Sequence, residues 1–414
     1  MIIIFNRKKI RYFLFACFSL FFAVLIAKYI QISKPENSLP TTQTLSGTET
    51  ENKTENNFLQ GMWIPYMDLD VSKFEDKKEA FEKNFQYITE IAKNHGIDTL
   101  VVHVRSHSDS LYPSKIFPTS HILTGNQGED INFDPLKYMV ETAHKNNLKI
   151  HAWINPLRIS SASVPEKICS SNPCKTEIFK NKLIKHQDGL IYNPAYPEVR
   201  KLVCDGVKEI AENYNIDAIH FDDYFYPKLE NMISDDTAYR QHIENSPIKN
   251  DEKIEDWRKE NINLLIKEVH ETIKNINSNI EFGISPPGNA EKCSKVGIDI
   301  GTWIKEDYID YLCPQIYWSL EFVDMPFEKT LNNWIHLTKK SNVKLYAGLA
   351  LYKACTDADN GTWKNDKKIL AKEINLVHKN NLSGIMLYSA NYFEKLKNTE
   401  EIEYLDEKLK TPSI

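Results

Sequence analysis

The chain has 414 residues, of which 42% are hydrophobic and 11% aromatic, so it is long enough and apolar enough to bury a large core. Its formal net charge is −6 at pH 7, and its sequence pI is about 6.1. A chain with this balance has no overall basic field, which argues against a nucleic-acid partner.

The N-terminal segment has the pattern of an export signal. Four basic residues precede an apolar run over residues 12–27, which matches a basic n-region followed by an h-region. We therefore predict a signal anchor or transmembrane segment over residues 1–33, with its positively charged end in the cytoplasm. The rest of the chain would then lie outside the cell membrane as part of a single-pass protein, or be secreted if the signal is cleaved.

The next segment, residues 34–57, is rich in Ser, Thr, Asn and Glu and has few large apolar side chains. Such a composition cannot offset the entropy of ordering, so we predict a disordered linker.

An exported chain can form disulfides, and Cys169 and Cys174 are near enough in sequence for a local one. Cys293 and Cys355 are a weaker pair.

From residue 58 to residue 412, short β-rich runs alternate with longer segments of helical periodicity. The expected strands are Gly61–Tyr66, Thr99–Arg105, Lys149–Asn155, Ala218–Asp223, Ile280–Ser285, Tyr311–Tyr317, Lys344–Leu349 and Gly384–Ser389. Expected helices follow most of them, at Lys77–Asn94, Pro135–Asn146, Pro197–Tyr214, Ile254–Ile276 and Asp366–Asn380. This alternation predicts an α/β protein with one (β/α)8 TIM barrel. No Gly-x-Gly-x-x-Gly follows a strand, which disfavours a dinucleotide site.

Polar residues gather near the carboxyl ends of four expected strands, where the active sites of such barrels lie. Side chains alternate in direction along a strand, so residues of one parity should face the barrel mouth together. The residues that share a parity within their strand are His103 and Arg105; His151, Trp153 and Asn155; His220, Asp222 and Tyr224; and Gln315 and Tyr317.

Asp222 and Asp223 are the strongest catalytic candidates. Two adjacent carboxylates near aromatic and amide groups suit glycosidic bond cleavage, which needs one protonated acid and one ionised carboxylate or an assisting group of the substrate. Adjacent strand residues point apart, which favours Asp222 facing the mouth and Asp223 in a neighbouring role. A structural reading remains open, in which one aspartate caps a loop or helix and the other pairs with Arg105. The second catalytic carboxylate is also open among Asp109, Glu321 and Asp324.

Aromatic side chains at or beyond the strand ends fit sugar binding, since their faces stack on pyranose rings, although aromatics also fill cores. The candidates are Trp63, Trp153, Tyr224, Tyr226, Tyr317 and Trp318. His103 and His151 are better explained as hydrogen-bonded core residues, and His220 fits either role.

Several motifs are shared with one protein family. They are Gly61–Ile64, Val104–Arg105 with Asp109, Tyr112–Ser114, Leu123–Gly125, Phe133–Leu136, His151–Pro156, Ile219–Pro227, Phe282–Pro286, Asp310–Trp318 and Tyr346–Tyr352. Over roughly Gln60 to Phe393 the chain resembles the glycosyl-hydrolase-like family 10 proteins of bacteria. It departs from the family pattern at Ser106–Asp109, where Pro-x-Gly-Asp is usual, and at Pro287–Asn289.

The resemblance implies a barrel glycoside hydrolase that cuts O-glycosidic bonds in a bacterial cell-wall glycan, in particular peptidoglycan strands lacking stem peptides. It assigns catalysis to Asp222 and Asp223. We expect no metal or other cofactor. Combined with the strand-end pattern, it predicts substrate contacts from Arg105, Asp109, Trp153, Asn155, His220, Tyr224, Gln315, Tyr317 and Trp318.

Two rival functions compete with this one. A metal-dependent hydrolase would need zinc ligands, for which His103, His151, His220 and Asp222 are the candidates; the chain lacks His-x-His on its first strand and histidine on its fifth and sixth. A glycan-binding barrel without catalysis is favoured by the absence of an obvious second carboxylate. The oligomeric state does not follow from the sequence.

Overall fold

A computed structural model describes residues 58–162, 164–228, 236–245 and 252–411 of the chain. The predicted anchor at 1–33 and linker at 34–57 lie outside this range. Among the residues it describes, no helix combines the length and the apolar character needed to cross a membrane.

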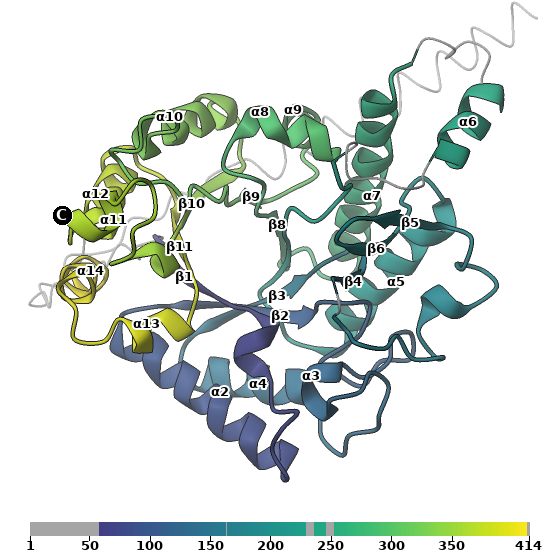
Figure 1. Cartoon of the computed structure of the whole chain (residues 1–414), viewed down its shortest axis with the longest axis horizontal. Coiled ribbons are helices and arrows are strands. Elements are labelled where there is room, and N and C mark those ends of the chain that lie inside the picture. Colours follow the sequence, from purple (N-terminus) through teal and green to yellow (C-terminus); the bar gives the residue numbers. More distant parts are fainter. Residues whose placement is uncertain (1–57, 163, 229–235, 246–251, 412–414) are drawn as a thin grey trace, which may run out of the picture. The chain divides into compact units, whose positions relative to one another are not determined.

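Parallel strands form a closed barrel at the centre of the domain, in the order β1-β11-β10-β9-β8-β7-β3-β2 (Figure 1). The first strand pairs with both the second and the last, which closes the sheet. The predicted TIM-barrel architecture is therefore confirmed. The strands are β1 (Leu59–Ile64), β2 (Thr99–Arg105), β3 (Lys149–Ile154), β7 (Ala218–Phe221), β8 (Glu281–Ile284), β9 (Tyr311–Leu312), β10 (Lys344–Leu349) and β11 (Gly384–Tyr388).

The strand β9 is much shorter than the expected strand, which extended to Tyr317. Pro314 has no N–H to donate to a ladder, so regular pairing stops before it. The chain nevertheless continues along the barrel through isolated bridges from Gln315 to Pro287 and to Gly348. Gln315 is thereby held at the barrel wall without belonging to a strand.

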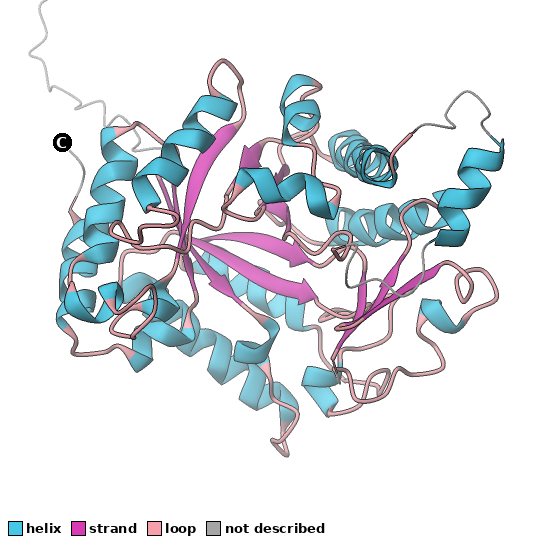
Figure 2. Cartoon of the chain, turned by 45° about the horizontal axis from the view of Figure 1, so that its top comes forward, coloured by secondary structure: helices cyan, strands magenta, loops and turns pink. Residues whose placement is uncertain are grey.

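Helices surround the barrel, as Figures 1 and 2 show. Two of them begin where the side chains of Asp76 and Asp134 accept hydrogen bonds from backbone N–H groups, which are otherwise unsatisfied in a first turn. The helices of four or more residues are α2 (Lys77–Asn94), α3 (His121–Thr124), α4 (Pro135–Lys145), α5 (Pro197–Asn213), α6 (Asp236–Asn245), α7 (Ile254–Ile276), α8 (Ala290–Cys293), α9 (Ile300–Lys305), α10 (Phe327–Thr338), α11 (Thr362–Asn365), α12 (Ile369–Lys379), α13 (Asn391–Lys395) and α14 (Glu400–Lys410), together with the 3-10 helix η1 (Tyr66–Leu69).

The barrel interior holds a chain of polar groups. The Trp63 indole N–H lies 3.3 Å from His220 Nε2, and the other ring nitrogen of His220 lies 2.9 Å from the Tyr311 hydroxyl. That hydroxyl lies 3.1 Å from His151 Nδ1. Gly283 leaves space for the Tyr311 ring, since a Cβ on Gly283 would lie 2.0 Å from that ring. Burial keeps the pKa of both histidines below the usual range, so they act here as neutral hydrogen-bonding core residues.

A second, smaller sheet is inserted between β3 and α5. It consists of β4 (Arg158–Ser161), β6 (Gly189–Tyr192) and β5 (Leu183–His186), paired antiparallel in that order. The Tyr192 hydroxyl lies 2.8 Å from the hydroxyl of Ser108, in the loop after β2. This accessory sheet is thus anchored to a barrel loop and places its first residue, Arg158, beside the ends of β2 and β3.

The disulfides considered from the sequence are not formed. All six cysteines in the described part of the chain are free. Cys169 Sγ lies 3.2 Å from the Ser171 hydroxyl, whereas Cys174 is buried in the hydrophobic core.

Candidate active site

Asp222 follows β7 at the barrel mouth and is almost fully buried, with 3% of its surface exposed. Its Oδ2 accepts hydrogen bonds from the Trp153 indole N–H, at 3.0 Å, and from Asn155 Nδ2. Its Oδ1 accepts one from the backbone N–H of Tyr224, at 3.2 Å. Burial raises the pKa of Asp222 to about 7, against the opposing charge of Arg158. The carboxyl group is therefore substantially protonated near neutral pH.

Asp223 has different partners. Its Oδ1 accepts a hydrogen bond from Gln315 Nε2 at 2.9 Å, and the same nitrogen lies 3.0 Å from the Ser285 carbonyl oxygen. Burial raises the pKa of Asp223, while the Gln315 hydrogen bond favours its charged form. Asp222 and Asp223 thus contact different barrel segments, and both lie just beyond β7, which ends at Phe221 and is shorter than the expected strand.

Arg158 was missed by the sequence analysis. Its Nε donates to the Ser106 carbonyl oxygen at 2.8 Å, and its Nη2 donates to Asn155 Oδ1. Its guanidinium also lies over the Tyr224 ring, 4.7 Å from the ring centroid. The available signal was its position three residues after Asn155, but Arg158 lies on the accessory sheet and strand-end parity does not extend to it.

Aromatic residues surround the two aspartates. Trp153 stacks on His103, with ring centroids 3.8 Å apart and an interplanar angle of 9°. Tyr224 is 55% exposed, the most open side chain of the group. The half-buried Tyr317 has its ring 6.1 Å from Tyr388. Trp153 is buried, with 7% of its surface exposed, so Tyr224 and Tyr317 are the rings of this group that leave a face accessible.

Two predicted substrate contacts occupy less direct positions. Trp318 is half-buried and packs near Gly288, where a Cβ would lie 2.7 Å from its ring. His220 has no exposed surface and belongs to the polar chain inside the barrel, beneath the mouth. His220 therefore supports the site from below.

Arg105 lies away from this group, contrary to the strand-parity expectation. The β2–β3 register shifts between His103 and Arg105, so an extra residue turns Arg105 to the other face of the sheet. Its guanidinium is buried against Phe117, 4.4 Å from the ring centroid, and a Cβ on Gly206 of α5 would lie 1.9 Å from Nη1. Arg105 packs between barrel and helix, and it pairs with neither aspartate.

Asp109 is fully buried at the centre of the loop that follows β2. Its Oδ2 lies 2.9 Å from His121 Nδ1 and 3.3 Å from Gln127 Nε2, and its Oδ1 accepts from the backbone N–H of His107 at 3.3 Å. The first two interactions favour the ionised form, so the pKa of Asp109 is lowered despite its burial. Asp109 holds the loop together and is not open to a glycan.

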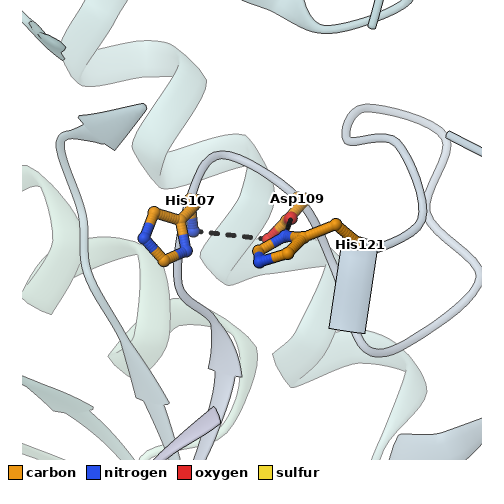
Figure 3. A group of neighbouring side chains, drawn as sticks. All are labelled: His107, Asp109 and His121. Carbon is orange, nitrogen blue, oxygen red and sulfur yellow. Dashed lines mark hydrogen bonds and ion pairs between the residues drawn. The ribbon is translucent and has the colours of Figure 1, made fainter. Parts of the chain in front are cut away.

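His107, Asp109 and His121 also form the one metal-ligand cluster among the residues with described positions, with ligand atoms within 4.8 Å of one another (Figure 3). These side chains fit a divalent cation by chemical type, although both Asp109 oxygens already accept hydrogen bonds. The zinc set considered from the sequence is not assembled in this described part: His151 and His220 contact Tyr311, whereas His103 contacts Asn155.

Asp68, in η1 after β1, is a further carboxyl group that the sequence analysis missed. It accepts hydrogen bonds from Asn391 Nδ2 at 2.8 Å and from the Asn391 backbone N–H at 3.4 Å. Burial raises its pKa to about 6. By contrast, Glu321 and Asp324 are exposed on the loop before α10. The sequence offered one indication of Asp68, namely its position just beyond the first expected strand.

A closed parallel barrel with buried carboxyl groups and aromatic faces at the carboxyl ends of its strands defines a protein of the barrel glycoside hydrolase class. The family model described as glycosyl hydrolase-like 10 matches residues 58–382, and the chain belongs to this family.

Among its relatives, glycosyl hydrolase YngK of Bacillus subtilis is 34% identical over 322 residues, which cover 73% of this chain and 62% of the relative. The chain thus spans less than two thirds of that protein. Glycosyl hydrolase DigH of Escherichia coli K12 is 29% identical over 337 residues, which cover 75% of this chain and 76% of DigH.

Solved structures share the fold at low sequence identity. The PgaB (BpsB) glycoside hydrolase domain of Bordetella bronchiseptica superposes with a TM-score of 0.60 at 12% identity, covering 86% of this chain and all of that domain. The endo-1,4-beta-mannanase of Rhizomucor miehei has a TM-score of 0.54, also at 12% identity, covering 86% and 95% respectively.

Proposed function

We propose that this protein hydrolyses O-glycosidic bonds, with Asp222 as the general acid. The observation that carries this proposal is a buried carboxyl group whose pKa is raised to about 7, at the mouth of a barrel. A general acid must hold its proton near the working pH and release it to the leaving-group oxygen in the transition state. Asp222 meets the first requirement through burial.

The hydrogen bonds of Asp222 indicate which oxygen carries the proton. Two N–H donors, from Trp153 and Asn155, point at Oδ2 and occupy its lone pairs. Oδ1 has one backbone donor, from Tyr224, and therefore keeps a position for a hydrogen atom. In the proposed reaction this proton passes from Oδ1 to the glycosidic oxygen as the bond from that oxygen to the anomeric carbon breaks.

Asp223 is proposed as the charged partner. Its hydrogen bond from Gln315 stabilises the carboxylate, which is the form needed to stabilise positive charge at the anomeric carbon. An N-acetyl group of the substrate can assist from the same side, and water completes hydrolysis. Tyr224, which is exposed, and Tyr317, which is half-buried, are proposed to contact the sugar, whereas the buried Asn155 and Trp153 hold Asp222 in place through their hydrogen bonds.

The proposed substrate is a bacterial cell-wall glycan, specifically peptidoglycan strands lacking stem peptides. Support comes from the family motifs along the chain and from the aromatic faces beside the carboxyl groups, which suit a polysaccharide. We further propose that the predicted N-terminal anchor holds the domain outside the cell membrane, where this glycan lies. Protection of the domain from external protease in intact spheroplasts would contradict that location.

The test is digestion of purified, peptide-free glycan strands by the full-length protein, with intact peptidoglycan as the comparison substrate. Mass spectrometry of the products identifies the bond that is cut, and the anomeric configuration distinguishes retention from inversion. The expected result is faster cleavage of the peptide-free strands. Binding of these strands without cleavage would instead establish a glycan-binding barrel.

A further inference from the structure

Arg158 joins the accessory sheet to the barrel mouth. It is the first residue of β4 and pairs with Ile191 of β6, so its backbone belongs to the small sheet. Its side chain reaches the ends of two barrel strands, where it contacts the Ser106 carbonyl oxygen and Asn155 Oδ1. With 8% of its surface exposed, it is almost completely enclosed. Its position therefore depends on the accessory sheet.

The contact with Asn155 determines how that amide is oriented. A guanidinium has only donors, so the Asn155 atom that faces Arg158 must be the oxygen. The amide nitrogen of Asn155 then faces Asp222 and donates to Oδ2. Arg158 thus sets a direction of hydrogen bonding that runs from the accessory sheet through Asn155 to the aspartate.

The orientation of the Asn155 amide also determines the tautomer of His103. His103 Nε2 lies 2.7 Å from Asn155 Oδ1, and an oxygen that already accepts from Arg158 requires a hydrogen atom on that ring nitrogen. Without Arg158, His103 in its other tautomer can accept from a flipped Asn155 amide. The Asn155 oxygen would then face Asp222 Oδ2 and would hold the Asp222 proton there.

We propose that Arg158 is a positioning residue of the hydrolase, which acts through Asn155 to keep the proton of Asp222 on Oδ1, the oxygen that donates to the leaving group. This inference rests on the proposed function of Asp222. It also gives the accessory sheet a role in the reaction, because the sheet carries Arg158 to the mouth. The positive charge of Arg158 has a second effect, since it favours the ionised form of Asp222.

Two substitutions separate the charge of Arg158 from its hydrogen-bond geometry. Arg158→Gln removes the charge, and Arg158→Lys keeps the charge but loses the planar pair of donors. Lys185→Gln, at an exposed position of β5 in the same sheet, is the matched control. All variants are made in the full-length protein and compared with the parent for thermal unfolding.

The first measurement is the titration of Asp222 by carbon-13 NMR of labelled aspartate carboxyl groups, with its signal assigned from Asp222→Asn. We expect the titration midpoint to rise most in Arg158→Gln, which loses both the charge and the direction of Asn155, to rise less in Arg158→Lys, which loses only the direction, and to remain near that of the parent in Lys185→Gln. The second measurement is kcat and KM on peptide-free glycan. Both Arg158 variants should lose about 10- to 100-fold in kcat with little change in KM.

An unchanged kcat in a folded Arg158→Lys variant would overturn the positioning role, and an unchanged Asp222 midpoint in Arg158→Gln would overturn the electrostatic link. If Arg158→Gln does not fold, Arg158→Lys decides the positioning role through kcat. If the parent protein cuts no glycan, the proposed function fails, and the NMR titration by itself decides whether Arg158 controls Asp222.

Discussion

Asp222 and Asp223 are adjacent in the chain, yet their carboxyl groups are held by different parts of the barrel. Trp153 and Asn155, from the end of β3, donate to Asp222, whereas Gln315, beyond β9, donates to Asp223. This separation gives the two groups different electrostatic surroundings, which is how two carboxyl groups come to perform two different roles in a glycosidase.

Replacing Asp222 with asparagine removes the proposed proton donor and preserves the size of the side chain. We expect kcat on peptide-free glycan to fall by about 10²- to 10⁴-fold, the usual contribution of a general acid, with KM changed little. Initial rates and thermal unfolding of the variant measure this. Glu321→Gln, on the exposed loop before α10, should match the parent; an Asp222→Asn rate equal to the parent rate would exclude Asp222 as the acid.

The activity should decrease as the pH rises above about 7. The raised pKa of Asp222 means that its proton is lost over this range, and a general acid without its proton is inactive. A profile of kcat/KM from about pH 4 to pH 9 should therefore show an alkaline limb near pH 7. A rate that stays constant up to pH 9 would show that Asp222 does not act as an acid.

Gln315→Leu should shift the acidic limb of the same profile. The substitution removes the N–H donor 2.9 Å from Asp223 Oδ1, which stabilises the carboxylate. The pKa of Asp223 should then rise, so ionised Asp223 should be lost at a higher pH than in the parent. We expect the acidic limb to move upward and the maximal rate to fall about 10-fold. An acidic limb at the parent position would separate Asp223 from the reaction.

Gly206→Ala should destabilise the protein without affecting glycan binding directly. The added Cβ would lie 1.9 Å from Arg105 Nη1 and 2.6 Å from Phe117, in a tightly enclosed layer. Overpacking of this kind costs about 1–3 kcal/mol in the free energy of unfolding, which urea denaturation measures. Gly301→Ala, whose added Cβ meets nothing nearer than 3.7 Å, is the control and should be close to neutral.

The buried Glu401 should make stability depend on pH. Burial raises its pKa to about 7, and burial likewise raises the pKa of Glu373, which is also fully buried. The folded state therefore binds a proton more tightly than the unfolded state does. This contribution to stability is complete below about pH 4, the range of an unfolded glutamate, and is lost as the pH rises through about 7.

Glu401→Gln should consequently flatten the dependence of stability on pH. Because glutamine stays neutral and can keep the hydrogen bond from Leu370 N–H, the variant should gain stability relative to the parent between about pH 5 and pH 8, by up to about 3 kcal/mol. Denaturation at several pH values measures the difference. Glu403→Gln, exposed on the same helix, is the control; a constant difference across the pH range would rule out the buried proton.

The sequence by itself determined the architecture, because the spacing of apolar residues along the chain distinguishes strands from helices. The predicted bounds of Thr99–Arg105, Lys344–Leu349 and Ile254–Ile276 agree with the structure. Alternation along one strand also predicted that Asp222 and Asp223 face different surroundings. Both inferences use only neighbours in the chain, so they require no knowledge of how distant segments meet.

The tertiary structure decided the features that depend on register and on long-range packing. One extra residue in β2 turns Arg105 toward α5, and no local pattern indicates it. The accessory sheet brings Arg158 to the mouth through contacts with other segments, such as Ser106. Burial, which gives Asp222 its raised pKa, is likewise a property of the assembled barrel. The sequence predicted where the candidate site lies, whereas packing determined which side chains surround Asp222 and Asp223.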